Sequence, residues 1–317
     1  MKKQIPTFSI VIPAYNAENN IVNALEGIRK QTFQDYEIII TDDGSTDDTR
    51  KVILQYKEQH PEIKIRYFWQ ENGGASSARW LCTKKAKGKY IAYLDADDIW
   101  YSNKLEVVMQ TIKKHKAQVY YHNEVEVGLN GKRKKLSYRK LNKKDPLTDL
   151  IINGNALSTS ATIVERTFHE RCDPFYDKKR MGEDYECWIR LATAGAKFYF
   201  INKVLGEYRR NIGSLTLKDD RYVKATNEEI VGFYDYLDKK NFSLKEINKL
   251  KLKRKAYNEY VLGRHYHQQG NYFKAIVSYK KSFKMGNCGL KCIAAMVLSL
   301  TKKAESERKD STKNEKK

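Results

Sequence analysis

The sequence predicts an α/β fold with a mostly parallel mixed sheet flanked by helices, followed by an α-helical C-terminal region. Three observations predict it: short apolar runs alternate with helical patterns over the first hundred residues, acidic motifs follow several of these runs, and strand patterns stop near residue 217. Strands that alternate with helices of about 10 to 15 residues are typical of βαβ units. The 317 residues are enough for about two domains.

Four strands are predicted in the first hundred residues from short runs rich in β-branched and aromatic residues: 8–12, 36–41, 63–69 and 90–94. Three helices are predicted between them: 17–30, a helix from the cap residues Ser45-Thr46-Asp47 to about Gln59, and 75–87. Ligands bind such sheets beyond the carboxyl ends of the parallel strands. Three motifs follow predicted strands and are expected to meet at that edge: Pro13-Ala14-Tyr15, Asp42-Asp43-Gly44 and Asp95-Ala96-Asp97.

Between residue 100 and about residue 217 the pattern is mixed. Strands are predicted at 118–127, 135–139, 161–164 and 197–201, and helices at 146–153 and 184–194. After residue 217 only helical patterns remain: 222–239, 243–269, 272–284 and about 290–303. Residues 304–317 have almost no apolar side chains and are expected to be a basic disordered tail. The chain therefore divides into a domain of residues 1–217, a helical region of residues 218–303 and this tail.

The charge of the chain predicts anionic partners. Lys and Arg number 60 against 39 Asp and Glu, which gives a net charge of +21. Residues 112–144 hold 11 basic and 2 acidic residues, and residues 239–255 hold 8 and 1. Such segments are compatible with a solvated basic surface, with nucleic-acid arms or with contact to an anionic membrane. Aromatic and basic residues do not alternate as they do in a base-stacking surface, so we expect no nucleic-acid partner.

Cysteine usage and the apolar pattern indicate a reduced protein that does not span a membrane. The 5 cysteines are an odd number at wide spacings without paired C-x-x-C motifs, which argues against disulfides and zinc. Residues 1–7 lead into a strand without the apolar core of a signal peptide, and no run reaches about 18 apolar residues. We expect a cytoplasmic protein that associates peripherally with the inner face of the cell membrane.

Asp95 and Asp97 form the first candidate site. Two carboxylates at positions i and i+2, directly after an apolar strand, are able to share a metal ion. Mg²⁺ and Mn²⁺ prefer one or two carboxylates with phosphate oxygens and water, so this spacing suits a metal-bound diphosphate. The alternative is that Asp simply favours loops and that Asp98 caps the following helix.

Asp42 and the Asn72-Gly73-Gly74 segment are the next candidates. A carboxylate at a strand end can accept a hydrogen bond from the N3–H of a uracil ring or from a ribose hydroxyl. Residues 43–47 are equally suited to a turn and an N-cap, which is the alternative. The backbone N–H groups of Asn72-Gly73-Gly74 precede a predicted helix and can approach a phosphate or a sugar. A dinucleotide cofactor is not favoured, because no G-x-G-x-x-G motif accompanies them.

Glu183 and Asp184 lie at the start of the helix predicted over 184–194. Acidic residues in a first helical turn interact favourably with the helix dipole, which requires no function. A carboxylate at this position can also accept a proton from a substrate hydroxyl. The sequence leaves both interpretations open.

Six segments occur in a characteristic order between residues 6 and 215: FSIVIPAYNAE, YEIIITDDGSTDDT, ENGGASSAR, GKYIAYLDADD, GEDYECWIRLATAG and GEYRRNIGSLT. Together they resemble family 2 glycosyltransferases, which have the GT-A fold. The resemblance implies a set of residues that bind the nucleotide sugar, the first three of them at the nucleobase: Pro13, Tyr15, Asp42, Asn72, Gly73, Arg79, Asp95, Glu183 and Arg209. It also implies that Asp95 and Asp97 bind Mn²⁺ or Mg²⁺ and that Asp184 is the catalytic base.

The same resemblance implies an inverting transfer of a sugar from a nucleotide diphosphate sugar, with UDP preferred. The acceptor is expected to be a hydroxyl group of a glycan or lipid-linked molecule, as in bacterial surface polysaccharide synthesis. One alternative is a sugar nucleotidyltransferase, which needs a Gly-rich triphosphate loop that residues 13–16 do not provide. The other is a non-catalytic basic helical-repeat adaptor on a nucleotide-binding fold, which the presence of the four acidic residues disfavours: Asp42, Asp95, Asp97 and Asp184.

The helical region resembles one tetratricopeptide helix pair in a set of small and aromatic positions: Leu262, Gly263, Tyr266, Gly270, Ala275 and Tyr279. Glu259 stands where that repeat has Trp. A single repeat cannot bury a solenoid core, so we expect it to pack on the catalytic domain or to form a homo-oligomer contact. In the last helix, Ile293, Val297 and Leu300 share one face flanked by lysines, which is compatible with core packing or with an interfacial membrane helix.

Overall fold

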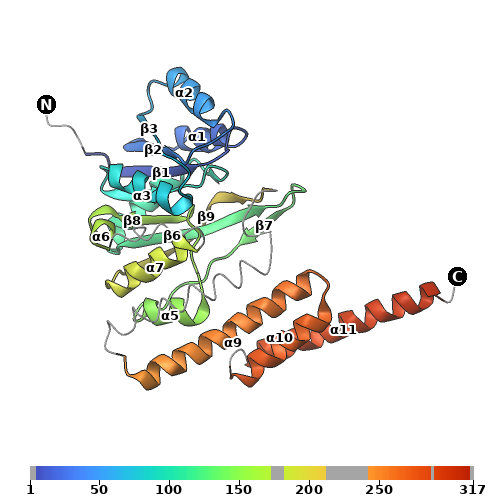
Figure 1. Ribbon diagram of the computed structural model, residues 1–317. Coiled ribbons are helices and arrows are strands. Elements are labelled where there is room, and N and C mark those ends of the chain that lie inside the picture. Colours follow the sequence, from blue (N-terminus) through green and yellow to red (C-terminus); the bar gives the residue numbers. More distant parts are fainter. Residues whose placement is uncertain (1–4, 173–181, 212–241, 287–288, 315–317) are drawn as a thin grey trace. The chain divides into compact units, whose positions relative to one another are not determined.

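The computed structural model describes residues 5–172, 182–211, 242–286 and 289–314, with side chains up to residue 303 (Figure 1). The chain divides into two compact units. The first comprises Met1–Leu147 and Asn155–Leu217, and the second comprises Thr148–Gly154 and Lys218–Lys317. The second unit therefore includes a short segment, 148–154, that lies within the catalytic domain expected from the sequence.

The first unit is built on one mixed sheet of nine strands within the described residues. They are β1 (Phe8–Ala14), β2 (Tyr36–Asp42), β3 (Ile65–Trp69), β4 (Tyr90–Tyr93), β5 (Ile99–Trp100), β6 (Val119–Val127), β7 (Arg133–Leu136), β8 (Thr162–Glu165) and β9 (Phe198–Arg209). Their order is β3-β2-β1-β4-β8-β6-β9-β5, and β7 pairs with β6. β1 to β4, β6 and β9 run in one direction, whereas β5, β7 and β8 run against their neighbours. This confirms the mostly parallel mixed sheet.

The inner strands are buried because they are almost entirely β-branched or aromatic. All seven residues of β2 are buried, and Ile10 of β1 and Ile38 of β2 lie in the same apolar core as Leu25. Burying one such side chain contributes about 1.5 to 3 kcal/mol relative to leaving it exposed. Ala14 pairs with Asp42 at the end of this parallel register, so the polar residues that follow β1 and β2 emerge at one edge.

Helices flank this sheet in the first unit: α1 (Ile21–Arg29), α2 (Thr49–Gln59), α3 (Ala75–Lys85), α4 (Lys104–Lys114), α6 (Arg166–Cys172) and α7 (Glu183–Thr193). The sequence predicts α1, α2, α3 and α7 within a few residues. It misses α4, whose β-branched residues blur the helical signal, and the short helix α6. It also misses β5, because two residues are too few to show a period.

Two strands differ from their predicted ranges. β7 lies at Arg133–Leu136 rather than 135–139, because Gly131 (φ 73°) closes a turn in which the Gly128 N–H donates to the Lys132 carbonyl at 2.8 Å. β9 continues to Arg209 rather than ending at 201, since its second half pairs with β5 and, after a register shift, with β6. The longer β9 carries residues 209–211 to the edge at which β4 ends.

The second unit is helical, with most of α5 (Pro146–Asn153, whose first two residues belong to the first unit), α9 (Leu244–Gln268), α10 (Tyr272–Lys284) and α11 (Gly289–Asn314). A capping box at Ser243 begins α9. α9 and α10 pack as the tetratricopeptide-like spacing predicts: a Cβ added at Gly263 would lie 2.6 Å from two ring carbons of Tyr279. The helix predicted at 222–239 lies outside the described residues.

α11 continues to Asn314, so residues 304–314 are helical where the sequence predicts disorder. Glu, Lys and Arg are strong helix formers, and a helix already stabilised by packing at Cys292 and Ser299 extends through them at low cost. Among the described residues, no helix is long and apolar enough to cross a membrane.

Candidate active site

The predicted site residues gather where β1, β2, β4 and β9 end. Asp42 is the last residue of β2, and its carboxylate is 1% exposed. Its Oδ1 accepts a hydrogen bond from the Ser45 N–H at 2.9 Å, and its Oδ2 accepts one from the Tyr67 hydroxyl at 2.7 Å. Tyr15, one residue beyond the end of β1, is 52% exposed and is available to a ligand. Pro13 lies within β1, paired with Thr41.

Asp43 organises the Asn72-Gly73-Gly74 segment. Its carboxylate accepts hydrogen bonds from the Gly73 N–H at 2.9 Å, the Gly74 N–H at 2.8 Å and the Gln70 side chain at 2.6 Å. Asn72 donates in turn to the Asp43 carbonyl at 3.1 Å. The N–H groups of Gly73 and Gly74 are therefore used by the protein, and Asp43 holds this loop beside Asp42.

Arg79 links the D-x-D segment to the Glu-Asp motif. Its guanidinium, on the buried face of α3, donates to Asp95 Oδ1 at 2.6 Å and to the Glu183 carboxylate. Arg79 is only 6% exposed. Burial alone would lower its pKa, but Asp95 and Glu183 raise that pKa above its ordinary value. Three motifs far apart in sequence thus meet around one buried cation.

Asp97 is the second carboxylate of the D-x-D segment. Its Oδ2 accepts a hydrogen bond from the Asn211 side chain at 2.8 Å. Burial, followed by repulsion from Asp95, raises its pKa to about 6. A carboxylate whose ionised form is disfavoured in this way gains most from a cation beside it.

The D-x-D segment fits a divalent ion that arrives with a diphosphate. Among the described residues, no group of three or more His, Cys, Asp or Glu side chains is placed to hold a metal by protein ligands alone. Mg²⁺ is usually held by one or two carboxylates with substrate phosphates and water, so Asp95 and Asp97 suffice as protein ligands. The raised pKa of Asp97 points in the same direction.

Asp184 lies in the first turn of α7, next to the Arg79 cluster. Its Oδ2 accepts hydrogen bonds from Asn155 at 3.2 Å and from Thr159 at 3.5 Å. Burial, followed by the neighbouring Glu183, raises its pKa to about 6, and Arg79 opposes this rise. A carboxylate with this pKa is ionised at neutral pH and is a stronger base than an ordinary Asp, as general-base catalysis requires.

Arg209 ends β9, and its backbone N–H donates to Asp98 Oδ1 at 2.9 Å. One interpretation of the sequence has Asp98 as the cap of α4. In the structure Asp98 instead joins the D-x-D loop to β9. The neighbouring Arg210 forms an ion pair with Glu126.

Several residues of this site escape the sequence analysis. Asn211 lies inside the last of the six motifs, two residues after Arg209, and this position was the one sequence signal that could have identified it. Tyr67, Asn155 and Thr159 lie in no motif, because they reach Asp42 and Asp184 only through folding. Lys104, which lies beneath the D-x-D loop, is also missed.

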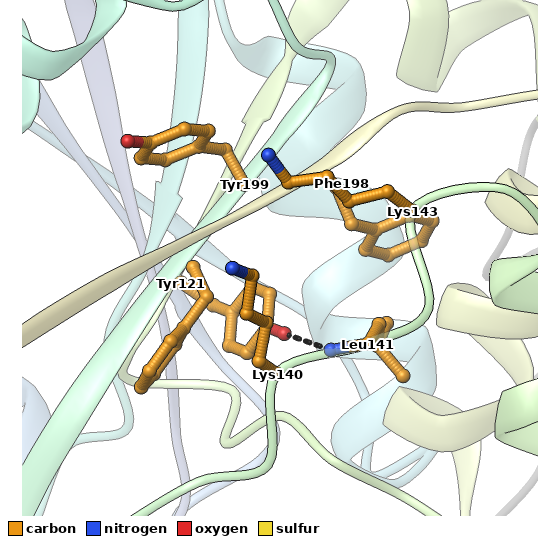
Figure 2. Close-up of a pocket in the computed structure, with 7 residues that line it drawn as sticks. Tyr121, Lys140, Leu141, Lys143, Phe198 and Tyr199 are labelled. Carbon is orange, nitrogen blue, oxygen red and sulfur yellow. Dashed lines mark hydrogen bonds between the residues drawn. The ribbon is translucent and has the colours of Figure 1, made fainter.

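A pocket lies away from these residues, against the first part of β9 (Figure 2). It is lined by Tyr121, Lys140, Leu141, Lys143, Phe198, Tyr199 and Phe200. The Tyr121 hydroxyl accepts a hydrogen bond from the Leu141 N–H at 2.8 Å. Phe198 pairs with Val119, the first residue of β6, so the pocket lies at the end of these strands opposite to Arg209. None of the predicted site residues lines it.

Comparison with protein families identifies the chain. The family model described as glycosyl transferase family 2 matches residues 9–171, about half of the sequence. The chain belongs to this family. The match includes Asp42, Arg79, Asp95 and Asp97, and it ends before Glu183 and Asp184.

Curated relatives are also glycosyltransferases. The chain is 31% identical over 189 residues to the UDP-Glc:alpha-D-GlcNAc-diphosphoundecaprenol beta-1,3-glucosyltransferase WfgD of Escherichia coli, covering 58% of this chain and 68% of that protein. It also matches longer uncharacterized glycosyltransferases from Rickettsia, of which it spans about a third. The match to the Rickettsia felis protein is 30% identical and covers 67% of this chain and 34% of that protein.

Solved structures share the fold. Residues 1–349 of Staphylococcus aureus TarS, in complex with UDP-GlcNAc, superpose with a TM-score of 0.62 at 18% identity, covering 88% of this chain and 81% of that one. The mannosyltransferase PcManGT from Pyrobaculum calidifontis, in complex with GDP-Man and Mn²⁺, gives a TM-score of 0.58 at 15% identity, covering 93% and 80%. The GT-A fold expected from the sequence is confirmed.

Proposed function

We propose that this family 2 glycosyltransferase moves a sugar from a nucleotide diphosphate sugar, with UDP as the preferred nucleotide, to a hydroxyl group of a glycan or lipid-linked acceptor, with inversion. The observation that carries this proposal is that Arg79 binds both Asp95 and Glu183. Asp184, the residue assigned as base, follows Glu183 and interacts electrostatically with Arg79, so it belongs to the same cluster as the segment assigned to the donor diphosphate.

The nucleotide is proposed to lie along the ends of β1 and β2. The exposed ring of Tyr15 offers a face to the nucleobase, next to Pro13 and the carboxylate of Asp42. Each Asp42 oxygen already accepts one hydrogen bond and keeps a second lone pair for the nucleotide. Asn72 and Gly73, ordered by Asp43, border the same end of the sheet. Arg209 is proposed to contact the diphosphate.

Asp95 and Asp97 are proposed to hold Mn²⁺ or Mg²⁺ together with the donor diphosphate. A divalent ion bound there would neutralise the charge that develops on the departing diphosphate. Asn211 orients the Asp97 carboxylate, and Arg79 orients Asp95. A structural neighbour in complex with GDP-Man and Mn²⁺ supports this assignment.

Asp184 is proposed to accept the proton of the acceptor hydroxyl. The acceptor oxygen forms a bond to the anomeric carbon of the sugar while the bond from that carbon to the diphosphate oxygen breaks. The proton passes to Asp184, and the nucleoside diphosphate leaves with the electron pair. A single displacement with one base inverts the anomeric configuration. Asn155 and Thr159 hold the carboxylate in place for this step.

A donor screen tests this proposal. Purified protein is mixed with UDP-, GDP- and dTDP-sugars and Mn²⁺, and slow donor hydrolysis and thermal stabilisation by each nucleotide are followed. We expect one donor to be hydrolysed selectively, and chelation or Asp97→Ala to abolish this hydrolysis. Asp48→Asn, whose side chain is 66% exposed, serves as the control and should behave like wild type. Hydrolysis of no donor, together with stabilisation by no nucleotide, would overturn the proposal.

We further propose that the second unit brings the enzyme to the inner, cytoplasmic face of an anionic membrane, where lipid-linked acceptors lie. Large apolar side chains on one face of α11 are exposed: Leu290, Ile293, Val297, Leu298 and Leu300. Cys292 and Ser299, on the opposite face, are buried against the other helices. Residues 242–303 hold 14 basic and 2 acidic residues, a charge that complements acidic lipids. A second copy of the chain is the alternative occupant of this face.

A further inference from the structure

Lys104, the first residue of α4, is buried completely, with 0% exposure. Lysine is almost never fully buried unless it is paired. Its Nζ donates a hydrogen bond to the Ser160 carbonyl at 2.6 Å and lies 3.6 Å from the centroid of the Trp100 ring. Such a site exists only because other groups replace the water that the ammonium group loses.

Burial lowers the pKa of Lys104 well below its ordinary value, and two buried carboxylates, Asp98 and Glu124, oppose this shift. Asp98 is 1% exposed and Glu124 is 0% exposed, and both interact electrostatically with the ammonium group. Glu124 also accepts a hydrogen bond from the Tyr138 hydroxyl at 2.8 Å. Ser160 also interacts with the Asp98 carboxylate, and Ser158 interacts with that of Glu124, so both carboxylates belong to one buried polar network with Lys104.

The groups around Lys104 also fix both ends of the D-x-D loop. The Asp95 N–H donates to Ser160 Oγ at 3.0 Å, and the Ser160 carbonyl accepts from the Trp100 indole at 2.9 Å as well as from Lys104. At the other end, Asp98 accepts from the Arg209 N–H. Lys104 thus holds the two residues that anchor the segment 95–98, although it belongs to no part of the proposed substrate contacts.

The charge balance explains why a cation is needed at this position. Asp98 is repelled by Asp97, Glu124 and Asp95, all in the same cluster. Arg79 pairs with Asp95 and Glu183, whereas Lys104 interacts with Asp98 and Glu124. Both cations are buried, so water screens the interactions of these charges poorly.

We propose that Lys104 is a positioning residue of the donor site: its buried amino group, which donates to the Ser160 carbonyl and interacts electrostatically with Asp98 and Glu124, keeps the D-x-D loop docked against β9 in the shape that binds a nucleoside diphosphate. This inference rests on the proposed function, since the loop is a donor site only in a glycosyltransferase. Lys104 acts through Asp95, Asp97 and Asp98 and touches no substrate.

The test compares Lys104→Met with Lys113→Met, a control on the same helix whose side chain is exposed. A double variant, Lys104→Met with Glu124→Gln, removes one charge of each sign and keeps an acceptor for the Tyr138 hydroxyl. For each protein, the Kd of UDP in the presence of Mn²⁺ is measured by calorimetry, KM and kcat for the donor are measured, and the melting temperature is recorded.

We expect Lys104→Met to weaken UDP binding and to raise the donor KM about 10-fold or more, because a displaced loop costs up to about 100-fold in similar cases. The double variant should regain much of this loss, since it restores the charge balance, and Lys113→Met should match wild type. If Lys104 serves stability alone, folded Lys104→Met would bind UDP with unchanged Kd and KM, which overturns the inference.

Should Lys104→Met not fold, the double variant and Glu124→Gln alone carry the test. Glu124→Gln leaves Lys104 with Asp98 as its one carboxylate of this pair. The inference then requires that Glu124→Gln changes the Kd of UDP more than the double variant does. Equal Kd values in wild type and both variants would overturn it. A wild-type protein that neither binds UDP nor turns over a donor would instead contradict the proposed function, so the two failures are distinguishable.

Discussion

The two units of the chain differ in where they bury positive charge. In the sheet unit, Arg79 and Lys104 are buried among carboxylates, with 6% and 0% exposure. In the described part of the helical unit, Arg254 is buried (4% exposed), but most other basic side chains lie on the surface, as do apolar residues such as Leu290 (85%) and Val297 (53%). The net charge of +21 therefore combines buried cations and surface cations, which have different roles. Buried cations shape a site, whereas surface cations determine what the protein contacts.

This difference predicts where substitutions act. Changes to buried charge should alter turnover and folding together, because both depend on the same ion pairs. Changes to the surface of the helical unit should alter binding to a partner and leave turnover of a soluble donor intact.

Arg79→Met should have the largest effect. Removing the cation leaves Asp95 and Glu183 buried without their partner, which typically costs about 3 to 5 kcal/mol of unfolding free energy. Donor turnover should fall about 100-fold or more, because the D-x-D segment and the base lose their common anchor. Chemical denaturation and a donor-hydrolysis assay measure these effects. Arg29→Met, which removes a surface ion pair with Glu26, should change stability and turnover only slightly. Turnover of Arg79→Met within about twofold of wild type would contradict the proposal that Arg79 links the D-x-D segment to the base.

Turnover should fall at acid pH because the base becomes protonated. The pKa of Asp184 is raised to about 6, so the rate with saturating donor should drop about tenfold for each pH unit below this value and level off above pH 7. A pH–rate profile of donor hydrolysis measures this. A turnover rate that stays constant from about pH 5 to about pH 7 would exclude Asp184 as the base.

The stability of the protein without donor should change with pH in the opposite direction. The folded-state pKa of Asp184 is raised from 3.8 to about 6, so the folded state binds more protons than the unfolded state between these values. The contribution of Asp184 to stability therefore falls as the pH rises through this window. Thermal melts of wild type and Asp184→Asn are recorded between about pH 4 and about pH 7.5. The melting temperature should fall more with rising pH in wild type than in Asp184→Asn. Parallel curves of melting temperature against pH would contradict the assignment.

Membrane binding should depend on the exposed face of α11. Wild type should sediment with vesicles that contain phosphatidylglycerol and much less with pure phosphatidylcholine. Ile293→Glu with Val297→Glu should reduce this binding about 10-fold or more, since each buried apolar side chain contributes about 1.5 to 3 kcal/mol. Hydrolysis of a soluble donor should not change.

The exposed position Asn248 on α9 provides the matched control, because Asn248→Glu introduces the same charge away from the α11 face. Equal vesicle binding by all variants would contradict the membrane proposal. Loss of a dimer on sedimentation, without any vesicle binding by wild type, would assign the face to a second copy of the chain.

Gly263→Ala should have the smallest effect. Its Cβ would meet the Tyr279 ring at 2.6 Å, so α9 and α10 must separate, and such overpacking typically costs about 1 to 3 kcal/mol. Asn248→Ala on the same helix should be neutral or slightly stabilising, because Ala favours helices. Chemical denaturation measures both. A Gly263→Ala variant as stable as Asn248→Ala would show that the helix pair is not closely packed at this position.

The sequence predicts the first four strands and their edge because each signal is local. Ile38 to Ile40 are β-branched and buried, and the acidic residues follow directly. The anchors of the site are not local. Asn155 reaches Asp184 over 29 positions, and Asn211 reaches Asp97 over 114, so no window of sequence contains both partners.

Lys104 shows the same limit more sharply. A lysine at the start of a helix is typical of a solvated position, and only folding brings it against the Trp100 ring and the Ser160 carbonyl. In the helical unit, Gly263 and Tyr279 were predictable because their spacing reflects one helix pair. The length of α11 was not, since residues 304–314 lack the apolar pattern on which helix prediction depends.

Asp184→Asn tests the central claim most directly, namely that one cluster binds the donor and supplies the base. UDP binding with Mn²⁺ and turnover of the selected donor are measured on the same preparations of wild type, Asp184→Asn and Asp97→Ala. We expect Asp184→Asn to bind UDP as wild type does while turnover falls about 100-fold or more, and Asp97→Ala to lose both. Wild-type turnover in Asp184→Asn would contradict the claim.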